Sequence, residues 1–370
     1  MRKSSNIQFI DLTLTKPSKK RTLDGISNLI NKKNFIGGQE VERFQKNFQD
    51  FNDSKYCLGV GNGTDAIEIA LESLGLPKKS EIIVPNFTFL SPAEAVIRGG
   101  YKLVLADIDL KDFNVSIESI KSLISKKTSA IIIVHLFGNP CNMSEILKLT
   151  KKYNIKLIED CSQAHGAEFK GKKVGNFGDI GTFSFYPTKN LGAFGDSGAI
   201  VTNKKNLYEK AKKIANHGRI DTYDHILAGR NSRIDSIQAF VLNEKIKSLN
   251  KNNQLRIKQA KLFLKKIKAE KIRLIELNSN QHSVFHQFPI LLEKRDLLAQ
   301  HLKNLGINTG IYYPKPLSKM SAFKNLVSTN KIHSENSEFA AKNILSIPIG
   351  PHLSIKDSEY ISNAIQSFGN

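Results

Sequence analysis

The stretch from Cys57 to Thr202 alternates short apolar, β-branched runs with amphipathic segments of helical periodicity. This alternation constrains the fold more than any other feature, because strands that repeatedly alternate with helices are typical of a sheet covered by helices on both faces. We therefore predict an α/β fold, with a mostly parallel, mixed sheet between helices. The expected strands are 81–84, 102–108, 130–136, 156–159, 182–186 and 199–202, and the helices between them include 66–74, 92–98 and 143–153.

A smaller C-terminal domain is expected to follow. Residues 235–269 have apolar side chains at helical spacing and predict one long helix that connects the domains. The remainder predicts an α+β module, with strands at 283–292 and 308–313 and helices at 295–305 and 356–368. A chain of 370 residues suits a large domain with a smaller one attached. We place the large domain at 1–249 and the small domain at 250–370.

The chain is strongly basic, with 55 Lys and Arg against 34 Asp and Glu, a net charge of +21. Its lysines fall mostly on the polar faces of helical segments, and no RNA-binding or helix-turn-helix signature accompanies them. We interpret this charge as a solvated, lysine-rich surface, and we expect no nucleic-acid partner. The alternative is a basic mouth that attracts an anionic small molecule.

The cysteines and the N-terminus are informative about the cellular location of the protein. Cys57, Cys141 and Cys161 are odd in number and widely scattered, which fits neither a disulfide framework nor a metal site. We expect reduced thiols and no metal. The N-terminus lacks the apolar core of a signal peptide, and no apolar run approaches the ~20 residues of a membrane span. These features predict a cytoplasmic protein without a membrane partner.

Two stretches place polar groups where strands end. Residues 61–66 (GNGTDA) lie between a strand and a helix, where small residues and the first helical N–H groups favour a phosphate, and Thr64 is the expected N-cap. An ordinary capped turn is the alternative. Residues 158–167 (IEDCSQAHGA) follow an apolar strand, at the position where ligands bind in open α/β sheets. There Asp160 could hold a protonated ring nitrogen and Gln163 a neighbouring oxygen, although Asp160 as a helix cap explains the spacing equally well.

The third stretch, residues 184–199 (SFYPTKNLGAFGDSGA), contains a lysine that is unusual for its surroundings. Lys189 lies among Gly, Pro and aromatic residues, whereas lysine is rarely buried without a purpose. Desolvation would lower its pKa and make its amine a nucleophile for Schiff-base chemistry. A lysine in a surface loop is the alternative that this stretch alone leaves open.

Together and in this order, the three stretches resemble the DegT/StrS-type family of sugar aminotransferases, PLP-dependent enzymes of the aspartate-aminotransferase superfamily (fold type I). The resemblance covers nearly the whole chain. Further matching blocks are 85–89 (PNFTF), 135–138 (HLFG), 229–235 (GRNSRID) with 238–239 (QA), 310–314 (GIYYP), 337–338 (SE) and 345–348 (LSIP). This resemblance implies a large PLP-binding domain and a homodimer with composite active sites.

The resemblance also implies roles for individual residues. Lys189 would form the Schiff base with pyridoxal 5'-phosphate (PLP), and Asp160 would pair with the pyridinium nitrogen so that the ring can accept electrons. Gln163 would contact the ring hydroxyl, and Phe89 would stack on the ring face. The residues expected to hold the phosphate are Gly63, Thr64, Ser184 and, from the neighbouring subunit, Asn231.

The implied reaction has two halves. An amino acid, with L-glutamate expected, converts PLP to pyridoxamine 5'-phosphate, which then aminates a dTDP- or UDP-linked 3-keto or 4-keto-6-deoxyhexose on a path to an amino sugar. Lys189 would carry the proton between the substrate carbon and the cofactor. Dehydratases of the family carry His at this position, so the lysine favours transamination. A sugar dehydratase and a non-catalytic regulatory relative are the alternatives.

Contacts to the substrate are harder to assign. The candidates are His165, His217, Arg233, Tyr312 and Glu338. His165 is explained equally well as a hydrogen-bonded structural histidine, and His217 as a residue of a solvated loop. Glu338 could instead hold a helix end. Ser318 and Tyr312 stand where many members of the family have His. Both departures fall where substrate recognition is expected, so they leave the identity of the sugar open.

Overall fold

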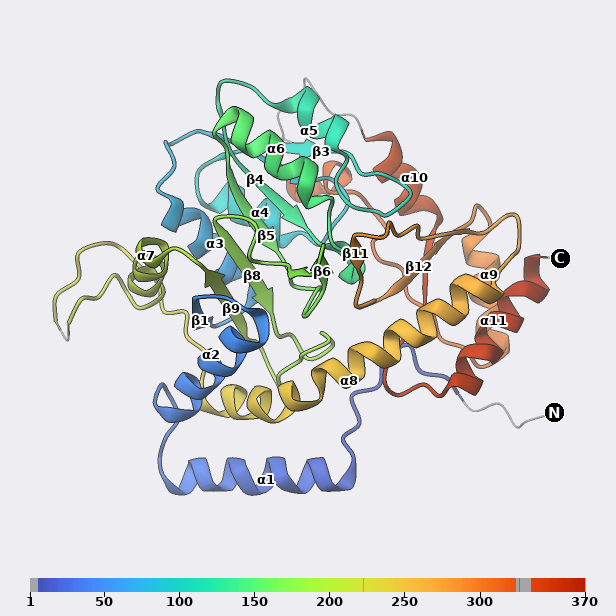
Figure 1. Cartoon of the computed structure of the whole chain (residues 1–370), viewed down its shortest axis with the longest axis horizontal. Coiled ribbons are helices and arrows are strands. Elements are labelled where there is room, and N and C mark those ends of the chain that lie inside the picture. Colours follow the sequence, from blue (N-terminus) through green and yellow to red (C-terminus); the bar gives the residue numbers. More distant parts are fainter. Residues whose placement is uncertain (1–5, 222, 324–325, 327–333, 370) are drawn as a thin grey trace.

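A seven-stranded sheet lies at the centre of the computed structural model, which describes residues 6–221, 223–323, 326 and 334–369 (Figure 1). Across the sheet the strands are β1 (Tyr56–Val60), β9 (Gly198–Thr202), β8 (Ile180–Ser184), β5 (Lys156–Asp160), β4 (Thr128–Val134), β2 (Glu81–Pro85) and β3 (Lys102–Ala106). Strand β9 is antiparallel to both neighbours, and the other neighbouring pairs are parallel. The predicted α/β fold with a mostly parallel, mixed sheet is confirmed.

Alternate residues of the buried strands pack on opposite faces of the sheet, as the two-residue period of a strand requires. Ile82 and Val84 belong to a core on one face, with α3 (Gly63–Leu74), α4 (Ser91–Arg98) and α7 (Lys205–Ala215). Ile83, between them, belongs to the core on the other face, with α5 (Ile117–Leu123) and α6 (Met143–Tyr153). Near β1 and β9 this second face is covered by α2 (Gln39–Asn52) and the start of α8 (Ser236–Lys266).

The long helix α8 runs from the large sheet to the C-terminal part, and α1 (Lys16–Asn31) lies beside it (Figure 1). The C-terminal sheet consists of β10 (Arg273–Leu274), β12 (Phe288–Leu291) and β13 (Ile344–Ile347), all antiparallel. Its helices are α9 (Arg295–Asn304), α10 (Glu335–Asn343) and α11 (Ile355–Gly369). Helix α8 passes unbroken through Leu249, where we keep the domain boundary as a proposal.

Short elements complete the described part of the chain. Strand β11 (Gln281–His282) pairs with β6 (Glu168–Phe169), which pairs with β7 (Lys172–Lys173), so this small sheet joins the two parts of the chain. The 3-10 turns are η1 (Leu136–Gly138), η2 (Leu317–Lys319) and η3 (Ser321–Phe323). Cys57, Cys141 and Cys161 are buried and free of disulfides. Among the described helices, none has both the length and the hydropathy that crossing a bilayer requires.

One predicted strand is wrong. Residues 308–313 pair with the C-terminal sheet only through Gly310, whose N–H and C=O both bond to Ser346 of β13. The pairing stops there because Tyr312 turns to stack on Phe9 and Pro314 has no N–H to donate. The strand predicted at 283–292 is also shorter than expected and is limited to β12.

Candidate active site

The amino end of α3 meets the carboxyl end of β8 at one edge of the large sheet. A Cβ on Gly63 would lie 2.6 Å from Cβ of Ser184, so only glycine fits this position without a shift of Ser184. The Thr64 hydroxyl lies 2.7 Å from the Ser91 hydroxyl. The first N–H groups of α3 and the nearby hydroxyls thus form a cradle whose polarity suits a phosphate.

Thr64 is not the N-cap of this helix, contrary to the prediction. The helix begins one residue earlier, at Gly63, and Asn62 is its cap: the Asn62 Oδ1 accepts from the Asp65 N–H at 2.8 Å. Asn62 takes this position because its backbone is extended, as capping requires, whereas Thr64 already lies within the first turn. The Thr64 hydroxyl is therefore available to a ligand or to Ser91.

Asp160 is the last residue of β5 and is buried in the site. Its Oδ1 accepts from the Ser162 N–H at 3.0 Å in a turn, and residues 161–167 form no helix, so the helix-cap alternative is excluded. Burial raises the pKa of Asp160, and the hydrogen bonds from Ser162 and the positive charge of Lys189 oppose that rise. A buried carboxyl at this position is suited to hold the proton of a ring nitrogen.

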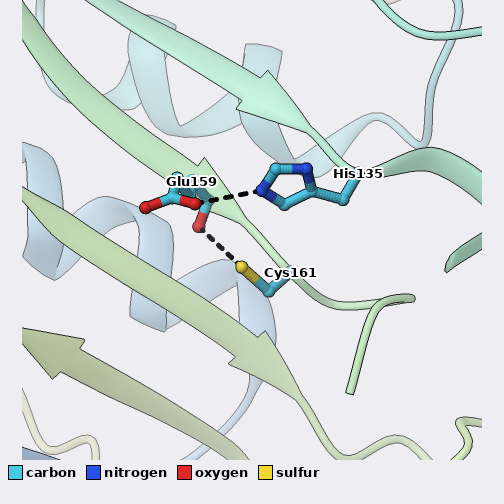
Figure 2. Close-up of side chains that lie close together, drawn as sticks. All are labelled: His135, Glu159 and Cys161. Carbon is cyan, nitrogen blue, oxygen red and sulfur yellow. Dashed lines mark hydrogen bonds and ion pairs between the residues drawn. The ribbon is translucent and has the colours of Figure 1, made fainter. Parts of the chain in front are cut away.

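A hydrogen-bond network surrounds Glu159, the residue before Asp160, and Figure 2 shows its side chains. His135 Nε2 lies 3.1 Å from Glu159 Oε2, and Cys161 Sγ lies 3.7 Å from the Glu159 carbonyl oxygen. The Cys141 N–H donates to His135 Nδ1 at 3.0 Å, so the ring proton lies on Nε2 and points to Glu159. The other donors to the Glu159 carboxylate, at 2.7–2.8 Å, are the backbone N–H groups of Gly175, Phe177 and Gly178.

The same three side chains could in principle ligate a metal, since the potential ligand atoms of His135, Glu159 and Cys161 lie within 4.8 Å of one another. The Glu159 oxygens already accept four N–H groups, however, and a cation would have to displace them. We therefore interpret the cluster as a structural network. It fixes β5 next to Asp160 and ties it to β4 through His135.

Gln163 connects the site to the C-terminal part of the chain. Its Oε1 accepts from the Phe137 N–H at 2.7 Å, and its Nε2 donates to the Tyr313 hydroxyl at 3.1 Å. The Tyr313 ring lies 6.2 Å from the ring of Phe89, which is 51% exposed. Burial raises the pKa of Tyr313. Sequence reasoning missed Tyr313; its only signal was its place beside Tyr312 in a block that matches the family.

Lys189 is partly buried in a loop whose backbone is held by the bond from its own N–H to the Tyr186 carbonyl, at 2.8 Å. Burial lowers its pKa to about 8, although the negative charge of Asp160 acts in the opposite direction. The alternative of a freely solvated surface lysine is therefore excluded. Near neutral pH the amine is much closer to its neutral, nucleophilic form than an exposed lysine.

His165 lies behind the site, where its ring packs against Phe183 and Phe185. Its Nε2 donates to the Ser184 carbonyl at 3.0 Å, and its Nδ1 has no partner in the described part of the chain. Burial and the nearby charge of Lys189 lower the pKa of His165 to about 3, so the ring is neutral. These contacts support the structural alternative for His165 over a substrate contact.

The loop between α7 and α8 carries three of the predicted site residues and projects from the large sheet (Figure 1). His217 and Arg233 are exposed, and so is Asn231, whose Oδ1 accepts from Arg233 Nε at 3.0 Å. Arg230 anchors the base of the loop through ion pairs with Glu68 and Glu72. The loop thus has a fixed base and exposes His217, Asn231 and Arg233 to solvent or to a second chain.

The remaining substrate candidates lie on the C-terminal side. Tyr312 is partly buried and stacks on Phe9 at 5.8 Å, next to Tyr313. Glu338, in α10, accepts from the Ser334 hydroxyl at 2.6 Å and pairs with Lys319 at 3.2 Å, which supports the helix-end alternative.

Ser318, one of the departures from the family pattern, is held by buried Asn86. The Ser318 N–H donates to Asn86 Oδ1 at 2.8 Å, and Asn86 Nδ2 donates to the Ser318 hydroxyl at 3.0 Å. Asn86 follows the carboxyl end of β2, so this pair joins the 3-10 turn η2 to the edge of the large sheet. A serine at this position therefore has a defined place in the fold.

A cavity of about 970 Å³ opens beside Lys189 and is called the basic chamber below. It lies between the segment 9–15, α1, the loop 187–192, α8 and the C-terminal residues 349–352. The Lys and Arg side chains that line it are Arg21, Lys189, Lys245, Lys247, Lys251 and Arg256, against the acidic residues Asp11 and Glu244. Sequence reasoning left a basic mouth open as an alternative, and the chamber supports it alongside a lysine-rich surface.

The fold and these residues define a PLP-dependent aminotransferase: a buried acid for the ring nitrogen, a lysine of lowered pKa and a phosphate cradle at a helix end all fit the cofactor. The chain belongs to the DegT/DnrJ/EryC1/StrS aminotransferase family, whose model matches residues 17–366. The family resemblance inferred from the sequence is thus confirmed.

Three similar proteins illustrate the range of the family. The chain is 37% identical, over 98% of each chain, to a pleiotropic regulatory protein of Geobacillus stearothermophilus. It is 36% identical, over 99% of each chain, to a UDP-N-acetyl-3-dehydro-alpha-D-glucosamine 3-aminotransferase of Acidithiobacillus ferrooxidans. A crystal structure of DesV from S. venezuelae in complex with a ketimine intermediate superposes with a TM-score of 0.95, at 31% identity and 99% coverage of both chains.

Proposed function

We propose that this aminotransferase moves the amino group of L-glutamate to a keto group of a nucleotide-linked sugar, a dTDP- or UDP-linked 3-keto or 4-keto hexose, in amino-sugar biosynthesis. The observation that carries the proposal is the pairing of Lys189, with its lowered pKa, and the buried carboxyl of Asp160 in one site. The name of the A. ferrooxidans relative favours a UDP-linked sugar and ring position 3.

The residues of this chain would divide the work as follows. Bound PLP supplies an aldehyde for the amine and a ring that accepts electrons. Asp160 would hold the proton on the ring nitrogen, Gln163 would orient the ring hydroxyl, and the cradle around Gly63 and Ser184 would bind the phosphate. Lys189 Nζ would carry the proton between the substrate carbon and the cofactor's C4′ carbon, which its pKa of about 8 permits near neutral pH.

We further propose that the active sites are shared between two copies of the chain, with Asn231 reaching the partner's phosphate. The loop that carries Asn231 exposes apolar side chains that a partner would cover, since Ile220, Tyr223 and Ile226 are 50%, 91% and 56% exposed. A polar loop with a fixed base and an apolar, exposed tip is suited to pack on a second subunit.

Mixing two inactive variants tests the shared site. Dimers of Lys189→Ala mixed with dimers of Asn231→Ala, after subunit exchange, should recover about a quarter of the wild-type activity, because half of the dimers would be mixed and each would hold one intact site. Each variant alone gives the baseline. A mixture with no more activity than the two variants would overturn the shared site.

The reaction itself is tested by incubating the holoenzyme with L-glutamate and a panel of UDP- and dTDP-linked 3-keto and 4-keto sugars. Formation of 2-oxoglutarate that depends on one sugar, with the amino sugar found by mass spectrometry, is the expected result. The panel should include sugars with and without the 6-hydroxyl. Loss of water from a sugar without consumption of glutamate would instead identify a dehydratase.

A regulatory role is the second candidate, because the relative from G. stearothermophilus is named a pleiotropic regulatory protein. The complete set of Asp160, Gln163, Ser184 and Lys189 favours catalysis, since a scaffold has no need of all four. Salt-sensitive binding to DNA by protein that takes up no PLP would favour regulation. The cytoplasmic location stays a prediction from the sequence.

A further inference from the structure

The backbone on both sides of Asn231 is bound to the end of α7. Arg230, the residue before it, donates its N–H to the Ile214 carbonyl at 2.7 Å. Ser232, the residue after it, donates its N–H to the Ala215 carbonyl at 2.9 Å. The side chain of Asn231 is exposed, and its Nδ2 group donates to no acceptor among the described residues. Asn231 thus combines a fixed backbone with an amide donor that is free to bind an anion.

The side chains of the same two neighbours bind carboxylates of α3. The buried hydroxyl of Ser232 donates to Asp65 Oδ2 at 2.6 Å. The guanidinium of Arg230 forms an ion pair with Glu68 and, at 3.1 Å, a second one with Glu72. The three carboxylates are spaced by three and four residues, so they lie on one face of the helix. This face of α3 therefore holds the loop on both sides of its exposed amide.

Glu68 is buried and binds two arginines that connect different parts of the chain. Its Oε2 pairs with Arg230, and its Oε1 lies 2.8 Å from Nε of Arg98, the last residue of α4. Arg98 thus links two helices to each other, whereas Arg230 links a helix to the loop. Because each arginine leaves the other as a partner for Glu68, removing either one does not leave this buried carboxylate unpaired.

Building on the shared active site proposed above, we propose that Arg230 is a positioning residue, which holds the loop on α3 so that Asn231 reaches the phosphate bound by the partner subunit. A loop without this hold would have to be ordered when the cofactor binds, and that ordering would cost affinity. The two ion pairs order the loop beforehand, and the planar guanidinium can bind Glu68 and Glu72 at the same time. Arg230 touches neither cofactor nor substrate in this arrangement and acts through Asn231.

A double-mutant cycle on the affinity for PLP tests this positioning. The dissociation constant is measured by titrating PLP into the apoenzyme and following the absorbance of the bound cofactor. Asn231→Ala should weaken binding about 10–100-fold, because a hydrogen bond to a charged phosphate is lost, and Arg230→Gln about 3–10-fold. In the Asn231→Ala background, Arg230→Gln should change the affinity less than about twofold, since no amide is left to position. Additive losses would overturn the proposal.

Two comparisons separate positioning from a general loss of structure. Arg98→Gln removes the other ion pair of Glu68 and should change the affinity for PLP less than about twofold. Pyridoxal, which lacks the phosphate, should bind to wild type and to Arg230→Gln with affinities that agree within about twofold. Equal losses of PLP affinity in Arg98→Gln and Arg230→Gln, or equal losses for PLP and pyridoxal in Arg230→Gln, would show that the effect is structural and that the proposal is wrong.

A more conservative variant decides the matter if Arg230→Gln fails to fold or to form the dimer, which analytical ultracentrifugation detects. Arg230→Lys keeps the charge but can bind only one carboxylate closely, so it should weaken PLP about 2–5-fold and leave pyridoxal unchanged. An unchanged affinity for PLP in this variant contradicts the proposal.

The same titrations separate this proposal from the shared site on which it rests. If Asn231→Ala leaves the affinity for PLP unchanged, the shared site is wrong and the positioning role is wrong with it. If Asn231→Ala weakens PLP but Arg230→Gln does not, the shared site is right and only the positioning role is wrong. Neither titration uses an amino acid or a sugar, so both results are independent of the proposed reaction.

Discussion

The cofactor site and the basic chamber share Lys189 but differ in charge and in how the chain assembles them. The cofactor site is built from loops at one edge of the large sheet, around the buried acid of Asp160, and its polar groups largely satisfy one another. The chamber is built from segments far apart in the sequence and holds basic side chains, of which Arg256 and Lys245 have no carboxylate partner in the described residues. A site whose polar groups already bond to one another is preorganised for a permanently bound cofactor. A site with uncompensated positive charge is suited to an anionic ligand that binds and dissociates.

Replacing Lys189 should have the largest effect, because it belongs to both regions. Lys189→Ala should lower the rate of each half-reaction by at least about 10³-fold, since no other described side chain lies in both regions to carry the proton. Stopped-flow absorbance of the cofactor with glutamate, and separately with the pyridoxamine form and a keto sugar, measures both halves. In the wild type, borohydride should abolish the cofactor band. Persistence of that band in Lys189→Ala would disprove the assignment.

Asp160→Asn should come next, with a loss of at least about 100-fold in both half-reactions, because the ring nitrogen loses its counter-charge. The free energy of unfolding should hardly change, since the amide oxygen can still accept from the Ser162 N–H. This pattern sharpens the comparison, because a change confined to the cofactor site should impair both halves of the reaction alike. A selective loss of the glutamate half in Asp160→Asn would contradict the division into two regions.

Glu159→Gln tests the network beneath the cofactor site. The new amide would direct its NH₂ group at backbone N–H donors, which should destabilise the fold by about 3 kcal/mol. Urea unfolding monitored by circular dichroism measures this loss. Glu118→Gln, on the surface at the start of α5, is the matched control and should cost less than about 0.5 kcal/mol. Equal stability of the two variants would show that the network contributes nothing.

The two regions also differ in what the sequence could predict. The residues around Asp160 and Lys189 lie in contiguous motifs at strand ends, so local pattern and family resemblance were enough to propose them. Tyr313 gave only a weak signal, its place in the matching block 310–314, because its role depends on a contact with Gln163 that local sequence does not reveal. Arg256 gave no signal, because the cavity it lines is assembled from segments far apart in the sequence.

The wrong predictions for single helices and strands also come from tertiary contacts that the local sequence does not reveal. The strand predicted at 308–313 has a suitable pattern, but its pairing is limited to one residue, Gly310, by the packing of Tyr312 on Phe9. The cap predicted at Thr64 missed by two residues, because Asn62 and Thr64 are both suitable caps and flank Gly63, which packs closely against Ser184 as the first residue of the helix. Strand and helix positions in the sheet itself were predictable because burial on both faces leaves a strong apolar pattern.

The smallest expected effect compares two buried histidines, one in each region. Burial holds the pKa of His165 at about 3, and burial with the nearby charges of Lys189 and Arg256 holds that of His286 well below its usual range. As the pH falls below about 6.5, both histidines take up protons in the unfolded chain but stay neutral in the folded protein. The free energy of unfolding therefore falls by about 1.4 kcal/mol per pH unit for each ring. Urea unfolding between pH 6.5 and 4.5 should show a shallower slope in His165→Gln and in His286→Gln, each by that amount. An unchanged slope in His286→Gln alone would mean that this ring is already charged in the folded protein, and that the chamber is less positive than the unpaired Arg256 implies.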